Sequence, residues 1–385
     1  MIEKKWFNQF KSKTVLLRLD LNVPISNSAI LDESRIIGSL ETVKRLNESG
    51  AKVIVLAHLG KPKGQQKDSL SLKPIVERFS QCSKIPCFLY GGNLDKKEIK
   101  KQLRHSVVFL ENIRFNEGEE SCSESFSKKL ASLANCFIND AFSVSHRNHA
   151  SVVGVAKYIP AFPGPSMVYE IENLKALTEN PEKPFWIIMG GAKLKTKIPL
   201  IDALKNKVEG FVLGGGIANT FYKALGFEIG ESLHDLENLS WARDFFSESK
   251  KEKTFNVILP TEVLVKTGQG FKKKKYTEVL KNENILDTTL NSVSNIFENL
   301  DLARTIFWNG AFGAFEMDGA AEGTLTLAKL LSSHSAKVYI GGGETLASVK
   351  LANVENSFHF SSMAGGATLY YLSGKKLPGL EVLKI

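Results

Sequence analysis

Short, continuously apolar runs recur along the whole chain, and each is followed by Gly, Asp or Asn and then by a stretch with helical periodicity. Runs of this kind, rich in Val, Ile, Leu and Phe, are typical of strands buried on both faces of a parallel sheet. In chain order the expected strands are 15–19, 53–57, 107–110, 136–138, 185–189, 210–213, 257–259, 305–308 and 338–340. Helices are expected at 35–49, 124–134, 195–207, 217–225, 322–333 and 344–353. The alternation predicts an α/β fold.

Nine strands are too many for one open sheet of the usual size, and the sequence IPAFPGP at 159–165 interrupts the rhythm. We therefore expect two doubly wound parallel-sheet domains, 1–165 and 181–370. A helix at 166–180, which ends before Pro181 and Pro184, is predicted to join them. The remaining segment, 371–385, is expected to pack back on the first domain.

Charge narrows the function only in part. The formal net charge of +9 is compatible with nucleic acid, anionic lipid or acidic small substrates. Seven of the nine arginines precede residue 150, and the planar guanidinium grips phosphate or carboxylate better than an ammonium does. An anion site is therefore predicted in the first half, whereas the run Lys272–Lys275 is interpreted as a solvated loop rather than a groove for a polyanion.

Targeting and cysteine chemistry give negative indications. No apolar run approaches the 18 to 20 residues needed to cross a bilayer, and the first residues lack a secretion signal, so we expect a cytoplasmic protein without a membrane partner. The four cysteines show neither CxxC spacing nor a paired-histidine pattern, and we interpret them as reduced thiols.

Basic residues gather at the expected ends of strands in the first half. They are Arg35, His58, Arg114, His146, Arg147 and His149, with Asp20 and Asn22 close by in the sequence. Cations from several strand ends suit a small phosphorylated acid, whose oxygens accept forked hydrogen bonds from different directions. Taken singly, each Arg is more readily explained as a surface ion pair and each His as a structural residue. His146, Arg147 and His149 together are harder to explain in this way, because two histidines and an arginine at one loop seldom serve packing.

Glycine-rich segments follow strands in the second half. They are 190–197 (GGAKLKTK), 214–216 (GGG) and 341–345 (GGGET). Glycines between a strand and a helix let backbone N–H groups meet phosphate oxygens, although each run alone is equally compatible with a tight turn. Neither a P-loop nor a GxGxxG fingerprint is present, which argues against a nicotinamide dehydrogenase. If a helix starts at 193, Lys193 and Lys197 share its first face, where an anion would offset their charges.

The motifs, taken in order, resemble the phosphoglycerate kinase family over essentially the whole chain. The residues that carry the likeness are VLLRLDLNVP (15–24), AKVIVLAHLGKPKG (51–64), LENIRF (110–115), NDAFSVSHRNHAS (139–151), GGAKLKTKI (190–198), GGGIANTF (214–221), FWNGAFGAFE (307–316), GGGET (341–345) and GKKLPGLE (374–381).

The resemblance implies two Rossmann-like domains joined by a helix around an interdomain cleft. It also implies reversible transfer of a phosphoryl group between ATP and the carboxylate of 3-phosphoglycerate, giving ADP and 1,3-bisphosphoglycerate, with Mg²⁺ as cofactor. On this basis we expect a monomer that acts on small molecules and binds no nucleic acid.

The resemblance also implies roles for individual residues. Those implied to be catalytic are Arg35, Lys193, Gly343 and Gly366. Those implied to hold phosphoglycerate are Asp20, Asn22, Arg35, His58, Leu59, Gly60, Lys61, Arg114 and Arg147. Those implied to hold the nucleotide are Lys197, Glu316, Gly342, Gly343, Glu344 and Thr345, with Glu344 as the metal ligand.

Several departures from the family pattern bear on function, among them the altered segments 287–290 (DTTL) and 362–368 (SMAGGAT), the second of which lacks the first glycine of the family's run. Lys61 stands where the family usually has Arg, and Glu344 stands where it usually has Asp. A divergent relative that binds phosphoglycerate or a partner, with weakened or lost turnover, is therefore the alternative to an active kinase.

Overall fold

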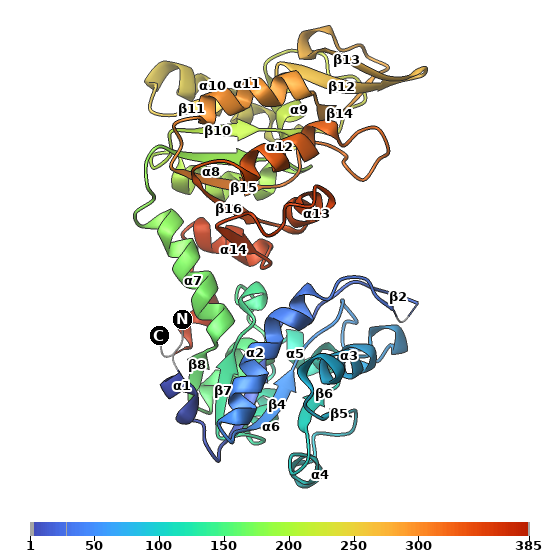
Figure 1. The fold of residues 1–385 in the computed structure, drawn as a ribbon, viewed down its shortest axis with the longest axis vertical. Helices are drawn as coiled ribbons and strands as arrows, with labels where there is room; N and C mark the ends of the chain where they lie inside the picture. The colour runs from blue at the N-terminus through green and yellow to red at the C-terminus, as the bar shows by residue number, and fades with distance from the viewer. Residues whose placement is uncertain (1–3, 28, 384–385) are drawn as a thin grey trace. The chain divides into compact units, whose positions relative to one another are not determined.

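The computed structural model describes residues 4–27 and 29–383 and divides the chain into two compact units. The first unit spans Met1–Glu172 together with Lys376–Ile385, and the second spans Asn173–Lys375. Each unit is built around its own six-stranded sheet (Figure 1).

The first sheet is entirely parallel, with the order β5-β6-β4-β1-β7-β8. Its strands are β1 (Thr14–Arg18), β4 (Lys52–Leu56), β5 (Cys87–Tyr90), β6 (Val107–Leu110), β7 (Cys136–Asn139) and β8 (Ala161–Pro163). All four strands predicted for this half are present. The sequence pattern missed β5 and β8, and β8 lies within the proline-rich interruption because an edge strand tolerates Pro.

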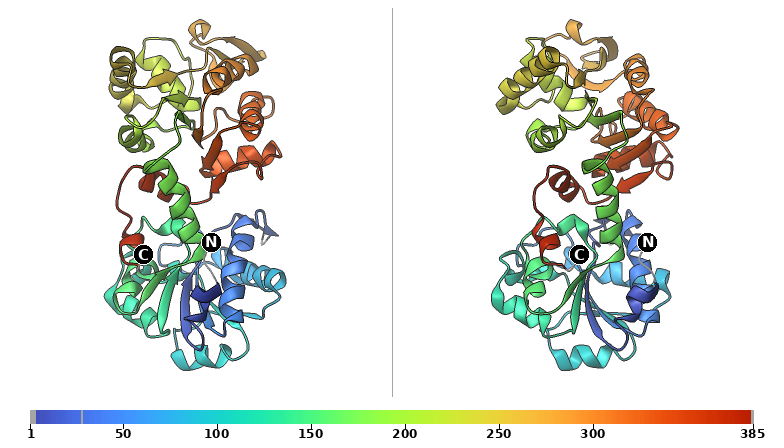
Figure 2. Two further views of the ribbon diagram at one scale, coloured as in Figure 1. Left: turned by 60° about the vertical axis from the view of Figure 1, so that its left-hand side comes forward. Right: turned by 90° about the vertical axis from the view of Figure 1, so that its left-hand side faces the viewer.

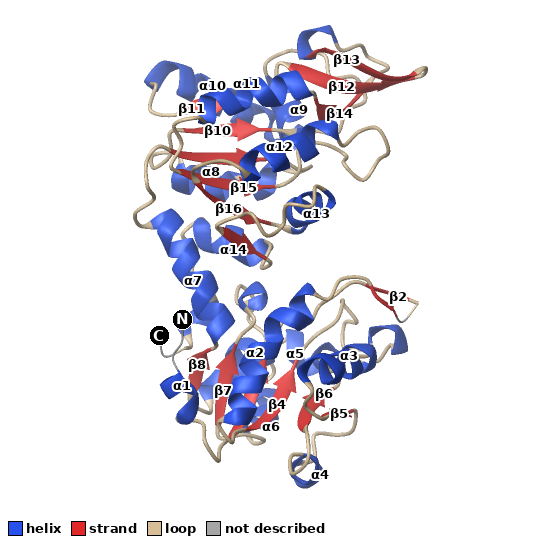
Figure 3. Ribbon diagram, viewed as in Figure 1, coloured by secondary structure: helices blue, strands red, loops and turns tan. Residues whose placement is uncertain are grey.

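Helices cover both faces of this sheet (Figure 3). They are α1 (Lys4–Asn8), α2 (Ser34–Glu48), α3 (Lys73–Ser83), α4 (Lys96–Gln102), α5 (Glu117–Glu120) and α6 (Glu124–Ala131). Val15, Leu17 and Val53 pack in one core with Val43 of α2 and Phe79 of α3. The intervening strand residues are buried on the opposite face, which explains why the strands read as continuous apolar runs rather than as alternating ones.

The second sheet repeats this plan, with the order β11-β10-β9-β15-β16-β17, all parallel. Its strands are β9 (Phe185–Met189), β10 (Gly210–Leu213), β11 (Asn256–Ile258), β15 (Thr305–Asn309), β16 (Lys337–Gly341) and β17 (Phe360–Ser362). Its helices are α8 (Ile198–Leu204), α9 (Gly215–Ala224), α10 (Leu239–Glu252), α11 (Leu290–Leu300), α12 (Glu322–Ser332), α13 (Gly343–Leu351) and α14 (Gly366–Leu372). The predicted fold class is confirmed: both sheets are parallel and helix-covered.

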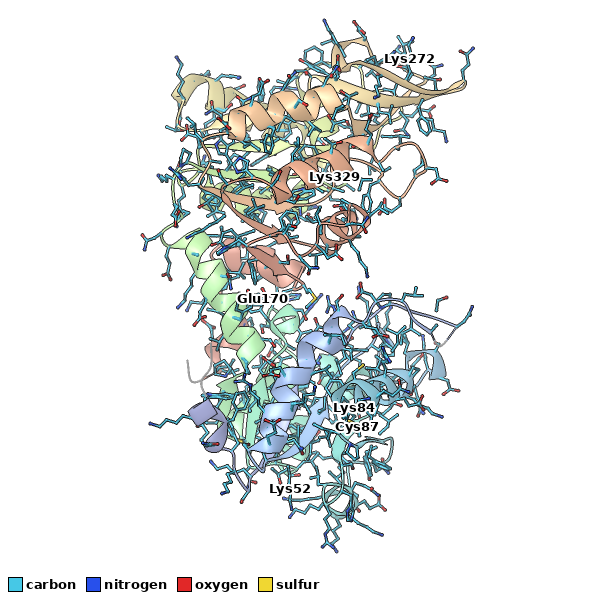
Figure 4. All side chains as sticks on the ribbon, viewed as in Figure 1. Lys52, Lys84, Cys87, Glu170, Lys272 and Lys329 are labelled. Atoms are coloured by element: carbon cyan, nitrogen blue, oxygen red, sulfur yellow. The ribbon has the colours of Figure 1, made fainter. Side chains whose placement is uncertain are left out.

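A small antiparallel sheet extends the second unit and corrects one prediction. It has the order β13-β12-β14 and consists of β12 (Glu262–Thr267), β13 (Gly270–Lys275) and β14 (Asn284–Thr288). The run Lys272–Lys275 therefore belongs to an edge strand and not to a loop; Lys272 is labelled on it in Figure 4. Lys274 forms an ion pair with the buried Glu283 at 2.8 Å, and lysines on an exposed edge discourage pairing with other chains.

The helix α7 (Pro165–Thr178) follows the first sheet, and the boundary between the two units falls within it. Its start is capped by Asp140, whose Oδ1 accepts hydrogen bonds from the backbone N–H groups of Ser166 (2.7 Å) and Met167 (3.2 Å). The side chain of Thr42 donates to Oδ2 at 2.6 Å. Burial raises the pKa of Asp140 to about 6, against the effect of these hydrogen bonds.

None of the described helices is long and apolar enough to span a membrane.

The last residues of the chain belong to the first unit (Figure 2). Here α15 (Pro378–Glu381) packs on residues 150–154, and the N–H of Gly379 donates to the carbonyl of Ser145 at 2.8 Å. A Cβ atom at Gly379 would lie 2.7 Å from Cγ1 of Val152 and 2.8 Å from Cα of Ser145. Only glycine fits this contact.

Gly379→Ala should therefore loosen the segment 145–155. Because the new methyl group meets backbone, we expect a loss of about 1–3 kcal/mol in the free energy of unfolding and faster hydrogen exchange in the peptide 141–155. Urea denaturation and exchange mass spectrometry measure the two effects. Gly268→Ala is the control, since a Cβ there meets nothing within 4 Å. Equal stability of the two variants would show that the contact is not tight.

Candidate functional site

The basic residues of the first unit lie at the carboxyl edge of its sheet. Asp20 and Asn22 follow β1, His58 to Lys61 follow β4, Arg114 follows β6, and Arg147 follows β7. The strands β6, β4, β1 and β7 are consecutive neighbours in the sheet. The sheet order thus brings together at one edge the side chains that the sequence singled out, joined by Arg35 in the first turn of α2. We call this group the basic edge.

Asp20 and Asn22 organise the loops of the basic edge. The carboxylate of Asp20 forms an ion pair with the guanidinium of Arg35, both partly buried. The side-chain oxygen of Asn22 accepts a hydrogen bond from the backbone N–H of Gly60 at 2.9 Å. Gly60 adopts a positive φ of 61°, which favours glycine at this turn.

Asn112, which the sequence analysis did not single out, ties two loops together. This fully buried side chain donates to the carbonyls of Leu59 (2.8 Å) and Leu70 (2.9 Å). Its oxygen accepts from the backbone N–H of Arg114 at 3.2 Å. The guanidinium of Arg114 in turn donates to the carbonyl of Gly60 at 2.9 Å. Arg114 is thus held over the loop that contains His58 and Lys61.

The loop after β7 contributes residues with different degrees of burial. In this loop Arg147 is exposed, whereas His149 is buried; Lys61, in the loop after β4, is also exposed. Burial and the neighbouring Arg114 lower the pKa of His149 to about 4, and burial and Arg147 also lower the pKa of His146. Both histidines are therefore neutral at pH 7, so the positive charge of this edge comes from its arginines and Lys61.

In the second unit the glycine-rich segments follow the carboxyl ends of β9, β10, β15 and β16. Gly190 and Gly310 approach so closely that a Cβ on Gly190 would lie 2.7 Å from the carbonyl oxygen of Gly310. Gly191, Gly310 and Gly342 all have φ between 90° and 100°, where side chains are strained. We call these segments, 190–193, 214–216, 310–316 and 341–345, the glycine-rich edge.

Asn309, at the end of β15, connects Gly341 of the glycine-rich edge to Lys197. Its Nδ2 donates to the carbonyl of Gly341 at 2.5 Å, and its Oδ1 accepts from the ammonium of Lys197. Burial lowers the pKa of Lys197 to about 8, and the carboxylate of Glu344 acts in the opposite direction. Lys197 is therefore a largely desolvated cation whose direct partner is neutral.

The two lysines do not share the first turn of one α-helix, and that expectation is corrected. Lys193 is exposed and precedes the 3₁₀ turn η6 (Leu194–Thr196), whereas Lys197 precedes α8. The turn separates them because Pro199 fixes the start of α8 only after Lys197. The predicted helix 195–207 is accordingly shorter, ending at Leu204.

The segment 341–345 places its residues in different environments. Thr345 is buried, and its hydroxyl accepts from the N–H of Gly310 at 2.6 Å and donates to the carbonyl of Gly341 at 3.0 Å. Glu344 is exposed in the first turn of α13, and its Oε2 would lie 3.1 Å from a Cβ on Gly191. The longer side chain thus reaches across to the loop after β9.

A cavity of about 260 Å³ opens beside the glycine-rich edge. Gly191, Gly215, Phe312, Glu316 and Glu344 are among its lining residues. The cavity wall thus combines glycines and apolar side chains with a carboxylate. Such a lining suits a flat aromatic group that carries polar substituents. Gly343 and Gly366 are exposed at the first positions of α13 and α14 and do not line this cavity.

The described residues contain no group of three or more His, Cys, Asp or Glu side chains able to hold a metal ion. Glu344 is the carboxylate that stands at the start of α13 in the glycine-rich edge. A site with one carboxylate suits Mg²⁺ that arrives with substrate phosphates and keeps several waters. The donor set therefore fits a metal bound together with a nucleotide.

The comparisons with known proteins agree with this arrangement. The family model described as phosphoglycerate kinase matches residues 6–375. A phosphoglycerate kinase of Dictyoglomus turgidum is 41% identical over 382 residues, covering 97% of this chain and 96% of the relative. One of Clostridium botulinum is 38% identical over 385 residues, covering 97% and 96%.

Solved structures are similar over the same length. The structure of phosphoglycerate kinase from Coxiella burnetii has a TM-score of 0.83 at 35% identity and covers 97% of this chain and 96% of its own. That from Pyrococcus horikoshii has a TM-score of 0.86 at 28% identity, covering 100% and 98%. Motif order, twin parallel sheets and full-length similarity lead to one conclusion: the chain belongs to the phosphoglycerate kinase family.

Proposed function

We propose that 3-phosphoglycerate binds at the basic edge and ATP binds at the glycine-rich edge, and that Mg²⁺ accompanies the nucleotide. Enzymes of this family transfer a phosphoryl group to a carboxylate. The observation that carries the assignment is the gathering of Arg35, His58 and Arg114 at one sheet edge, where their donors are fixed by Asp20, Arg18 and Gly60. Such fixed donors suit a ligand with a phosphate and a carboxylate.

The nucleotide is assigned to the second unit on separate grounds. The cavity beside Gly215 and Phe312 is wide enough for a base and a ribose, with Glu316 as the acceptor for ribose hydroxyls. The ammonium of Lys197 hydrogen-bonds to the neutral Asn309, and among the described residues no side chain caps the start of α13 at Gly342. Phosphate oxygens would satisfy both.

The chemistry requires positioning and charge neutralisation rather than a base. The acceptor carboxylate is ionised at neutral pH, so no proton has to be removed. We assign Arg35, Lys193 and the N–H groups of Gly343 and Gly366 to the oxygens of the transferred group. Mg²⁺, held through Glu344 and the nucleotide, supplies further neutralisation of phosphate charge.

The cellular setting is also a proposal. We propose a cytoplasmic monomer that acts on small molecules and has no nucleic-acid or membrane partner. No observation on the described residues favours the divergent relative with weakened or lost turnover.

Arg35→Ala and Lys193→Ala should each reduce turnover by about 10²–10³-fold, because each removes a cation assigned to the transferred group. A coupled assay with ATP, Mg²⁺ and 3-phosphoglycerate measures this. Arg45→Ala on the same helix and Lys195→Ala in the same loop are matched controls, since both side chains form surface ion pairs, with Glu41 and Glu237. Folding of all four variants is checked by circular dichroism. Near-normal turnover in either site variant would contradict the assigned transfer point.

Glu344→Asp should lower the Mg²⁺ concentration needed for half-maximal effect severalfold. The shorter side chain would hold the carboxylate closer to the nucleotide phosphates, which we propose bind at the start of α13. Titration calorimetry of ADP at a series of Mg²⁺ concentrations measures the coupling without turnover. Glu322→Asp, in the first turn of α12, is the control. An unchanged or weaker Mg²⁺ response would show that this carboxylate does not set the geometry of the metal.

A further inference from the structure

A chain of buried polar side chains runs beneath the basic edge. Arg18, the last residue of β1, is fully buried, and so is Glu119 of α5. The Nε of Arg18 donates to Oγ of Ser151 at 3.1 Å, and the Ser151 hydroxyl donates to Oε1 of Glu119 at 2.6 Å. The other Glu119 oxygen accepts from the Ser151 backbone N–H at 2.9 Å. None of these three residues was assigned a role from the sequence.

The far end of the chain reaches a residue of the proposed phosphoglycerate site. Nη2 of Arg18 lies 3.0 Å from Nδ1 of His58, and Nη1 donates to the carbonyl of Leu19 at 2.5 Å. A guanidinium has only donors and is not deprotonated in proteins. Nδ1 of His58 must therefore be the acceptor, so the imidazole is neutral and carries its proton on Nε2.

The Nε2 atom of His58 is available for a ligand. Within residues 4–27 and 29–383 it has no hydrogen-bond partner, and it is not among the fully buried polar atoms that lack one. The ring itself is only 5% exposed. One N–H donor, in a ring that cannot turn freely, is thus presented at the basic edge.

The surroundings of His58 keep the ring neutral. Four groups from four segments face it: Arg18 of β1, Arg35 of α2, Arg114 after β6 and His149 after β7. Burial and the charges of these arginines lower the pKa of His58 well below 6.5. The ring therefore adds no charge to the basic edge at neutral pH.

Glu119 explains how Arg18 is tolerated in this position. Burial lowers the pKa of Arg18 to about 10, which leaves it cationic at neutral pH, and the nearby Glu119 acts in the opposite direction. A buried cation without a countercharge is strongly destabilising. Burial also raises the pKa of Glu119, whereas Arg18 and the two Ser151 donors favour its carboxylate form.

We propose that Arg18 is a positioning residue, held by Ser151 and Glu119, that fixes His58 as the Nε2–H tautomer for donation to bound 3-phosphoglycerate. Its effect is to supply a directional, neutral donor among the surrounding cations. The claim that His58 donates to the ligand (the recognition part) rests on the proposed placement of phosphoglycerate at the basic edge. The claim about the tautomer of His58 (the tautomer part) depends only on contacts within the protein.

The tautomer is tested by long-range ¹H–¹⁵N correlation on the full-length protein labelled in histidine. His58→Gln assigns the His58 resonances among the seven histidines. The proposal expects an unprotonated Nδ1 and a protonated Nε2 that stay unchanged between about pH 5.5 and pH 8. A His58 ring that titrates in this range, or that carries its proton on Nδ1, would overturn it whatever the ligand does.

Two variants test the positioning role. Ser151→Ala removes the hydroxyl between Arg18 and Glu119. The double variant Arg18→Met/Glu119→Gln removes both buried charges together, so that neither is left unpaired. In both we expect mixed His58 tautomers and a roughly tenfold or greater rise in the Kd for 3-phosphoglycerate, with the Kd for ADP unchanged. Calorimetry measures the two affinities. Glu117→Gln is the control, because Glu117 is exposed on the same helix. Arg18→Lys retains a donor and should restore part of the tautomer preference.

Three outcomes separate the claims. Wild-type affinity for 3-phosphoglycerate in a variant with mixed tautomers would overturn the positioning role. A parallel loss of ADP affinity would show a general structural effect and overturn it as well. Wild-type protein with the expected tautomer that binds ADP but no 3-phosphoglycerate would overturn both the proposed substrate placement and the recognition part.

Discussion

Every strand of a parallel sheet ends at the same edge, and both six-stranded sheets of this protein are wholly parallel. The strands are buried on both faces, so the sheet interior leaves little room for polar groups. Polar side chains appear instead at the last strand positions: Arg18 ends β1, Asn139 ends β7 and Asn309 ends β15. The chemistry of each unit is therefore confined to one edge, and the glycines and arginines of distant segments meet there.

Each edge is held in shape by a buried asparagine. Asn112 joins the loops after β4 and β6, and Asn309 joins Gly341, the last residue of β16, to Lys197. An amide offers two donors and an acceptor without charge, so it connects backbone groups without adding to the electrostatics of an anion site.

The two edges balance their buried cations in different ways. Arg18 has an internal countercharge in Glu119, reached through Ser151. Lys197 is bonded to the neutral Asn309, and burial lowers its pKa to about 8. An anion that arrives at Lys197 would add to the partial neutralisation that Glu344 already supplies, whereas Arg18 already has a buried countercharge in Glu119. On the proposed placement of the ligands, the first unit would orient the acid substrate, and the second would supply a cation that a phosphate neutralises.

The periodicity and the motifs by themselves determined the fold class, nine of the strands and the family, since apolar runs and strand-end residues depend only on neighbours along the chain. Short or edge elements such as β5, β8 and the strand containing Lys272–Lys275 escaped, because pairing and not local pattern defines an edge strand. Only the tertiary structure decided which polar residues act together. Arg18 and Ser151 are 133 positions apart, and Glu119 looks like any surface carboxylate in the sequence until folding buries it against both. Charge burial and the direction of a hydrogen bond are properties of three-dimensional packing, so no local pattern could reveal them.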